Sequence, residues 1–222
     1  MKNTLRLFAC LLLTASLAAA GCNLFAGAYL IAHGPEKTPA VFTLPKEASV
    51  VIALDDRGSV VPQRNLRDVI GKTAEEEILA KELVREMVAA RLASAVMSRE
   101  RAGVPMGIAE VGKAVNADVV IYIVIDQFTL SEDGQTLSPV AAGRVKVIDS
   151  KTGKRLGPAE NGPADYYPLI VRLPPQGSTA PSTTNQLQQL QDLARLTGVY
   201  VSRMFYDAEI MTAPTKLQEP RR

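Results

Sequence analysis

Cysteine and histidine are scarce in this chain of 222 residues, which contains two cysteines and one histidine. Both cysteines, Cys10 and Cys22, lie near the amino terminus, so the rest of the chain can form no internal disulfide and offers no thiol nucleophile. Metal sites built from cysteine and histidine are excluded for the same reason. A folded domain here must therefore be stabilised by an ordinary apolar core, and the 47% hydrophobic composition is typical of a globular protein.

The single histidine, His33, precedes Gly34 and Pro35 and is expected to be a solvated loop residue. A Ser-His-Asp hydrolase of the elbow type needs a Gly-x-Ser-x-Gly sequence, and the chain has none. Residues 71–73, Gly-Lys-Thr, lack the preceding glycine of a phosphate-binding loop. We therefore expect no enzyme activity, no metal and no cofactor.

The chain also has little net charge, and its small positive excess comes from the first 21 residues. It carries 25 basic and 23 acidic residues, and the first 21 residues contain Lys2, Arg6 and no acid. Removal of residues 1–21 would leave 23 basic residues against 23 acidic ones. Such a balance gives no electrostatic indication of a nucleic-acid partner.

Residues 1–21 have the layout of a secretory signal peptide, with a basic start, an apolar run and small residues at the end. The sequence Ala19-Ala20-Gly21-Cys22 resembles a bacterial lipobox, although Ala19 stands where leucine is usual. The resemblance implies that the signal peptide is removed and that Cys22, carrying fatty acyl chains such as palmitate, becomes the new amino terminus. It also implies a membrane anchor on the periplasmic side of the bacterial cell envelope.

An uncleaved transmembrane helix is the alternative, because no charged residue occurs from Leu7 to Ala32 and about 20 apolar residues suffice to cross a bilayer. The basic end would then remain inside. Both alternatives place most of the chain in the periplasm. Asn23 follows Cys22, in place of the aspartate associated with inner-membrane retention, and this favours the outer membrane.

The remaining chain is predicted to contain a tether with prolines at 22–47, one α/β domain at 48–212 and a disordered tail at 213–222. Val41 and Phe42 in the tether are apolar enough to dock on the domain. Within the domain, the apolar, β-branched run at 49–56 predicts a strand that is buried on both faces.

Other elements follow from capping signals and periodicity. The capping box Thr73–Glu76 and an apolar stripe predict a long helix from Thr73 to Arg99, and Asn116 is expected to close a short helix at 107–118 in the left-handed conformation. Pro168 places a strand at the sheet edge. The complete prediction adds strands at 118–130, 139–150, 155–158 and 165–173, a loop at 174–186 and a helix at 186–210. Together these elements indicate a single α/β domain with a mixed β-sheet flanked by helices.

Two short motifs connect this pattern with a known group. Asn116-Ala117-Asp118 opens a long strand, and the next strand ends in Asp149 followed by Thr152-Gly153. In these features residues 48–206 resemble the TolB N-terminal-like domains of envelope lipoproteins, a group that includes curli-secretion (CsgG) and peptidoglycan-synthase activator lipoproteins. The resemblance implies the fold, and it implies binding to envelope proteins in place of catalysis.

Aspartates are the remaining candidates for chemistry, because five of them lie at predicted strand ends: Asp55, Asp56, Asp118, Asp126 and Asp149. Three of them, Asp55, Asp56 and Asp126, could meet in one crevice of an open α/β sheet. The favoured interpretation is structural, since aspartate side chains bind nearby backbone amides in turns. For Tyr166 and Tyr167, packing against the C-terminal helix is favoured over a partner-binding patch at the sheet edge; Tyr200 and Tyr206 are the other aromatic candidates.

The sequence therefore predicts a lipid-anchored, periplasm-facing binding or assembly module without catalytic activity. A partner protein of the envelope would meet the sheet edge or the loop at 173–186. Two alternatives stay open. One is a hydrolase of the envelope that uses Asp55 or Asp126 as base, and the other is a homo-oligomeric subunit of a secretion-type assembly.

Overall fold

The computed structural model describes residues 37–98, 106–174 and 183–210. Within the described residues, the chain divides into two units, residues 37–38 with 209–210 and residues 39–208. Strands β1 (Lys37–Thr38) and β8 (Ala208–Glu209) pair as a two-stranded sheet of their own. All other described elements belong to residues 39–208.

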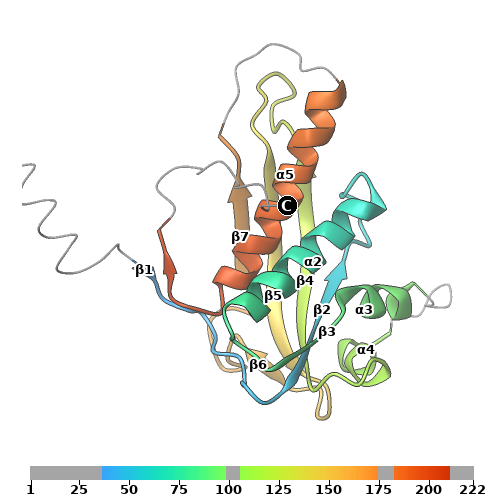
Figure 1. The fold of residues 1–222 in the computed structure, drawn as a ribbon, viewed down its shortest axis with the longest axis vertical. Coiled ribbons are helices and arrows are strands. Elements are labelled where there is room, and N and C mark those ends of the chain that lie inside the picture. Colours follow the sequence, from blue (N-terminus) through green and yellow to red (C-terminus); the bar gives the residue numbers. More distant parts are fainter. Residues whose placement is uncertain (1–36, 99–105, 175–182, 211–222) are drawn as a thin grey trace, which may run out of the picture. The chain divides into compact units, whose positions relative to one another are not determined.

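The main sheet has six strands in the order β3-β2-β4-β5-β6, and β7 pairs with β5. Strand β2 is parallel to both β3 and β4, whereas β5 is antiparallel to β4, β6 and β7. This mixed sheet confirms the predicted fold class (Figure 1). The strands are β2 (Ser49–Asp55), β3 (Glu86–Val88), β4 (Val119–Thr129), β5 (Val140–Asp149), β6 (Arg155–Gly157) and β7 (Tyr167–Arg172).

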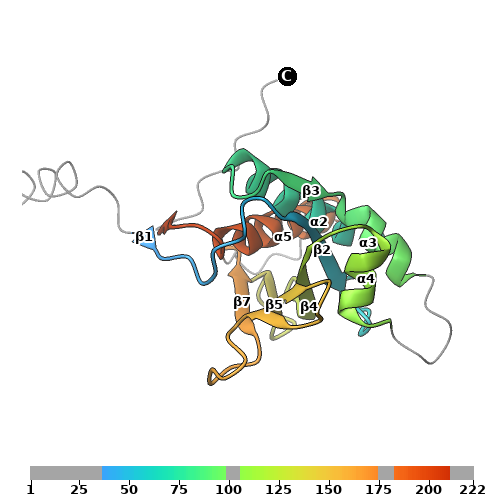
Figure 2. The ribbon, with the colours of Figure 1, turned by 90° about the horizontal axis from the view of Figure 1, so that it is seen from below.

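Among the described residues, four helices flank the sheet: α2 (Arg64–Ala80), α3 (Ala90–Met97), α4 (Ile108–Ala114) and α5 (Thr183–Arg203). Helices α2 and α5 pack against each other on one face (Figures 1 and 2). On the other face, Ala93 of α3 and Val111 of α4 share a core cluster with β2 and β4. Among the described residues, no helix combines the length and the apolar character that a membrane span requires.

The central strands were predicted well. Strand β2 is buried at every position after Ser49, and β4 and β5 occupy the ranges expected from their apolar runs. Asn116 has φ 57° just after α4, which confirms the left-handed helix end. Pro168 lies in β7, which pairs with β5 alone among the described strands and is therefore an edge strand, as predicted.

The long helix predicted from Thr73 to Arg99 is wrong. Helix α2 already begins at Arg64, and Thr73 lies inside it and does not cap it. The helix ends at Ala80, and the chain forms β3 before α3 begins. Of the apolar residues that continue the helical spacing after Ala80, Met87 and Val88 lie in β3, whereas Leu92, Ala95 and Val96 lie in the separate helix α3.

Backbone conformation and strand pairing explain this break. Glu82 adopts φ 52°, which a helix does not allow, and the Arg85 amide then donates to the Lys46 carbonyl oxygen at 3.0 Å. Val88 lies opposite Val51 in the parallel ladder. Long-range pairing with β2 has therefore overridden the local helical pattern.

The C-terminal helix also differs from its prediction. Helix α5 starts at Thr183, inside the predicted loop, and ends at Arg203, before residue 210. After the helix, the Met204 carbonyl oxygen accepts the Val41 amide at 2.8 Å. Residues 175–182 of the predicted loop and the tail from 211 lie outside the described residues.

The end of the tether is docked on the domain, as predicted for Val41 and Phe42. Besides its bond to Met204, Val41 accepts a hydrogen bond from the Tyr167 hydroxyl at 3.0 Å. The Phe42 ring lies over Gly157, where an added Cβ would come within 2.8 Å of the ring. The absence of a side chain at Gly157 therefore makes room for the tether.

Gly198 sets the close approach of α5 to α2. A Cβ at this position would lie 2.6 Å from the Ile70 carbonyl oxygen and 2.7 Å from Thr73 Cβ. Both neighbours are part of the α2 backbone or attached directly to it, so neither can rotate away. The helices can pack at this distance only with glycine at the crossing point.

We expect Gly198→Ala to lower the free energy of unfolding by at least about 1 kcal/mol, because overpacking outweighs the gain in helix propensity. Urea denaturation followed by circular dichroism measures this. Gly58→Ala is the matched control, since its Cβ would make an ordinary contact of 3.5 Å with Val60. Equal stability of the Gly198 variant and wild type would contradict the role of Gly198.

Candidate binding groove

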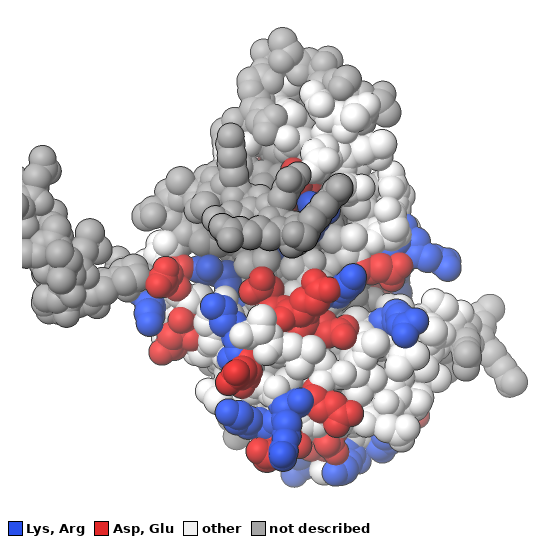
Figure 3. Space-filling view, in the orientation of Figure 1, with Lys and Arg blue, Asp and Glu red and all other residues white. Residues whose placement is uncertain are grey.

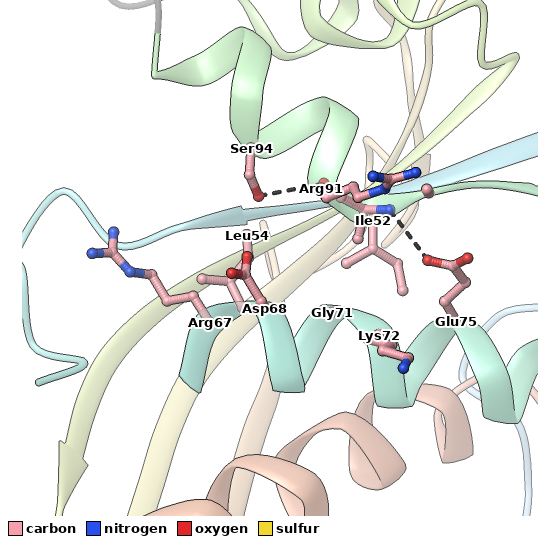
Figure 4. A pocket seen from close by; sticks show the side chains of 11 residues that line it. Ile52, Leu54, Arg67, Asp68, Gly71, Lys72, Glu75, Arg91 and Ser94 are labelled. Atoms are coloured by element: carbon pink, nitrogen blue, oxygen red, sulfur yellow. Dashed lines mark hydrogen bonds between the residues drawn. The ribbon is translucent and has the colours of Figure 1, made fainter. Parts of the chain in front are cut away.

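Two adjoining cavities of about 430 Å³ each lie where β2 ends, between α2 and α3. They share five lining residues, which are Leu54, Arg67, Asp68, Arg91 and Ser94. The two cavities therefore form one depression, which we call the α2–α3 groove. Figure 4 shows Ile52 and Leu54 between the two helices. The carboxyl end of a parallel strand is where open α/β sheets commonly bind ligands.

The groove exists because β3 is short. It pairs with residues 49–51 of β2, so among the described strands nothing continues beside Ile52 and Leu54 on that side. Helix α3 starts there instead. Gly71 allows α2 to lie close to the start of α3, since a Cβ added at Gly71 would lie 3.0 Å from Ala90 Cβ. The Glu75 carboxylate accepts the Ala90 amide at 3.2 Å and so ties the start of α3 to α2.

Charged side chains of both signs line the groove. The basic ones are Arg57, Arg64, Arg67, Lys72 and Arg91, and the acidic ones are Asp55, Asp56, Asp68 and Glu75. Acidic and basic side chains are also interspersed on the face of the molecule shown in Figure 3. The groove thus combines an apolar floor with a polar rim, which is typical of a binding site for an organic ligand or a peptide.

Asp55 and Asp56, predicted at a strand end, both reach the groove. Asp56 is 6% exposed, and its carboxylate accepts the amides of Val60 at 2.8 Å and of Val61. Arg67 Nε lies 3.5 Å from Asp56 Oδ2, close enough for an ion pair. Asp56 therefore stabilises the turn that leads from β2 into α2, as aspartates at strand ends commonly do.

Asp55, the last residue of β2, has a similar structural role. It accepts a hydrogen bond from the Tyr122 hydroxyl and the backbone amide of Arg57, and it forms an ion pair with the Arg57 guanidinium at 3.2 Å. Burial, together with this bond to Asp55, raises the pKa of Tyr122 above its ordinary value. Tyr122 consequently stays a neutral donor, and it links β4 to the end of β2.

The other predicted aspartates lie elsewhere, so the three-aspartate crevice is wrong. Asp126 forms a bidentate ion pair with Arg144, with distances of 2.7 Å and 2.8 Å, and it does not line the groove. Asp118 and Asp149 lie where β4 begins and β5 ends, at the opposite end of the sheet. Asp149 accepts the Thr152 amide at 2.7 Å in the turn after β5.

The tyrosines occupy separate places. The Tyr166 ring lies beneath Lys146 and Arg144, whose charged groups are 4.8 Å and 5.1 Å from the ring centre. Tyr167 donates to the tether at Val41, as described above. Tyr200 and Tyr206 have cationic neighbours, Arg203 at 5.9 Å and Lys81 at 5.4 Å. Tyr166 and Tyr167 therefore contact different parts of the protein.

The predicted lipidation residue Cys22, the lipobox residues Ala19, Ala20 and Gly21, and His33 lie outside the described residues. Within the described residues, no group of three or more His, Cys, Asp or Glu side chains is placed to hold a metal ion. The sequence predicted the two groove aspartates but none of the groove arginines. Arginine is common on protein surfaces, and only the meeting of α2 and α3 distinguishes these residues.

The sequence matches no protein-family profile and no curated protein. The PelC dodecamer from Paraburkholderia phytofirmans is similar in structure, with 12% identity, a TM-score of 0.40 and coverage of 77% of this chain and 96% of that chain. Lipoprotein GNA1162 from Neisseria meningitidis has 13% identity, a TM-score of 0.35 and coverage of 66% and 94%.

The hypothetical protein CT253 from Chlamydia trachomatis has 14% identity, a TM-score of 0.34 and coverage of 71% of this chain and 98% of that chain. Lipoproteins thus occur among the structural neighbours. The resemblance to TolB N-terminal-like domains stays a prediction.

Asp118 provides a test of the polar network at the far end of the sheet. Its carboxylate accepts hydrogen bonds from Lys151 at 2.9 Å and from the Ser49 amide and hydroxyl at 3.1 Å and 3.0 Å. These bonds, that of Lys151 above all, lower the pKa of Asp118 from 3.8 to about 2. The ionised carboxylate therefore stabilises the fold above pH 3.8, and this contribution is lost as the pH falls toward 2.

We expect Asp118→Asn to lower the free energy of unfolding at neutral pH, because the amide cannot pair with Lys151. The difference from wild type should shrink between pH 3.8 and pH 2. Urea denaturation of both proteins across this pH range measures the difference. A difference that stays constant down to pH 2 would contradict the ionic role of Asp118.

Proposed function

We propose that this protein is a lipid-anchored, periplasm-facing module of the bacterial cell envelope that binds another envelope protein in the α2–α3 groove and has no catalytic activity. The observation that carries the proposal is the groove itself, with its floor of Ile52 and Leu54 and its rim of charged side chains. Depressions of this kind bury apolar side chains of a partner and orient polar ones.

The state of the two groove aspartates supports binding over hydrolysis. A general base needs a carboxylate oxygen that can reach a substrate proton. Asp55 and Asp56 are 4% and 6% exposed, and their oxygens already accept bonds from Tyr122, Arg57 and the turn amides. These two carboxylates therefore stabilise the fold.

The lipobox-like sequence and the tether support the location. The chain is held from Lys37 onward, because Lys37–Thr38 pair with β8 and the Ala40 amide donates to Asp207, so the connection to the lipid would run from Cys22 to residue 36. Fully extended, such a connection would span at most about 54 Å. Two or more acyl chains on Cys22 would hold the protein firmly, because each buried CH₂ contributes about 0.8 kcal/mol.

For the anchor, we expect Cys22→Ser to abolish incorporation of radiolabelled palmitate and to prevent stable attachment to the outer membrane. Metabolic labelling and fractionation of intact cells measure both effects. Ser98→Ala, far from the amino terminus, is the control and should be labelled as in wild type. A wild-type protein that stays in the membrane without label would instead indicate an uncleaved N-terminal helix.

For the groove, we expect a photo-crosslinking amino acid at Lys72 to form an adduct with a second protein in intact cells. Lys72 is exposed and lines the groove. Lys154, equally exposed but in the turn before β6, is the matched control position and should give no adduct. Adducts at Lys154 and none at Lys72 would contradict binding in the groove, and an adduct of twice the protomer mass would favour the homo-oligomer.

A further inference from the structure

We propose that the α2–α3 groove recognises an acidic peptide segment, with a carboxylate held by Arg64 and Arg91 and a nearby apolar side chain placed over Leu54 in the adjoining cavity. This inference rests on the proposed function and specifies the chemistry of the partner. The two parts of the groove correspond to the two parts of such a ligand.

The charged part is the cavity beside the end of β2, which both Arg64 and Arg91 line. Two other arginines there have partners, since Arg57 pairs with Asp55 and Arg67 lies beside Asp56. Neither Arg64 nor Arg91 forms an ion pair with a residue that the structure describes, and both are exposed. The groove therefore presents guanidinium groups that its own acids do not neutralise.

Asp68 is the one acid of the rim that has neither an ion pair nor a backbone bond within the described chain. It stands against two guanidinium groups, so the remaining charge of this cavity is positive. Guanidinium groups bind carboxylates through paired, charge-assisted hydrogen bonds. A ligand carboxylate would neutralise the positive charge that remains in this cavity.

The position of the two arginines in their helices is a second, independent argument. Arg64 lies in the first turn of α2 and Arg91 in the first turn of α3, and neither turn contains an acidic residue. The helix dipole favours acids there and disfavours cations. The fold alone would thus be more stable with glutamate at both positions. A bound acidic group would interact favourably with the two guanidinium groups that stand there instead.

The apolar part is the adjoining cavity, where Ile52, Leu54, Gly71 and Ala90 line the floor. A free inorganic anion would leave this second cavity unfilled. An extended peptide can fill both, because side chains two positions apart in an extended chain lie on the same face, about 7 Å from each other. The size and the mixed character of the groove therefore favour a peptide over a small anion.

The test uses the full chain purified in mild detergent. A random heptapeptide library is selected on wild type, and the best peptide is synthesised for affinity measurements by fluorescence polarisation. We expect selected peptides to be enriched in Asp or Glu two positions away from Leu, Ile, Val or Phe. Replacing the acid by its amide should weaken binding at least about tenfold, and added salt should weaken it further.

The groove variant is Arg64→Glu combined with Arg91→Glu, which should weaken the peptide at least about tenfold. Its matched control is Lys46→Glu combined with Lys154→Glu, the same charge change at exposed positions outside the groove, with an expected effect below about twofold. The thermal midpoint of the groove variant should equal or exceed that of wild type, because glutamate suits both first turns. Lost binding would then not result from lost folding.

Selection of neutral or basic peptides, or no enrichment at all, would overturn the proposal. Binding of phosphatidylglycerol vesicles that the groove variant abolishes, without peptide binding, would also overturn it and assign the arginines to lipid phosphate. Adducts at Lys72 in cells without acidic enrichment would keep the proposed function and reject the acidic chemistry. Enrichment of acidic peptides without any cellular adduct would support the chemistry and question the proposed function.

Discussion

Among the described strands, only three residues of β2 have a neighbour on the side of β3, and the groove between α2 and α3 depends on this limit. Because β3 stops at Val88, the end of β2 is covered by α3 in place of another strand. The first residue of α3 is then held by Glu75 of α2, through a bond that neither helix could make alone. A longer β3 would fill the groove with backbone and remove the only described region where α2, α3 and β2 meet.

In the turn after β2, the hydrogen bonds that satisfy two buried carboxylates also position arginines of the groove. Asp55 and Asp56 are almost fully buried, so their carboxylates must accept hydrogen bonds or ion pairs to be tolerated. The bonds that satisfy them also fix the backbone that carries Arg57 and begins α2 at Arg64. The aspartates thus act on the groove indirectly, by holding its arginines in place.

Local sequence predicted those elements whose signals do not depend on distant partners. The apolar runs gave β2, β4 and β5, and the conformational preferences of Asn116 and Pro168 placed a helix end and an edge strand. The helix after β2 was misplaced, because the same apolar spacing suits a helix and the segment that pairs with β2. Its true start had no capping signal, since Gln63 makes no side-chain cap and Arg64 follows where an acid is usual.

The groove could not be predicted for a related reason. Its lining comes from β2, α2 and α3, and their meeting depends on the length of β3 and on Gly71, where the two helices come together. Gly71 precedes Thr73, where the helix was predicted to begin, so nothing local indicated that it lies at a helix contact. The aspartates were visible in the sequence because turn chemistry is local, whereas the partner of Asp126 is an arginine on the next strand.

The docked tether has a further consequence for how the domain would meet its surroundings. Val41 and Phe42 are attached to Tyr167 and Gly157, on the side of β5 where β6 and β7 pair, while the groove lies beside β2 and β3. Strands β4 and β5 therefore lie between the docked tether and the groove. Under the proposed function, a pull on the tether would act on β7 and the residues after α5 and leave the groove unstrained, so that a bound partner and the membrane would not compete for the same surface.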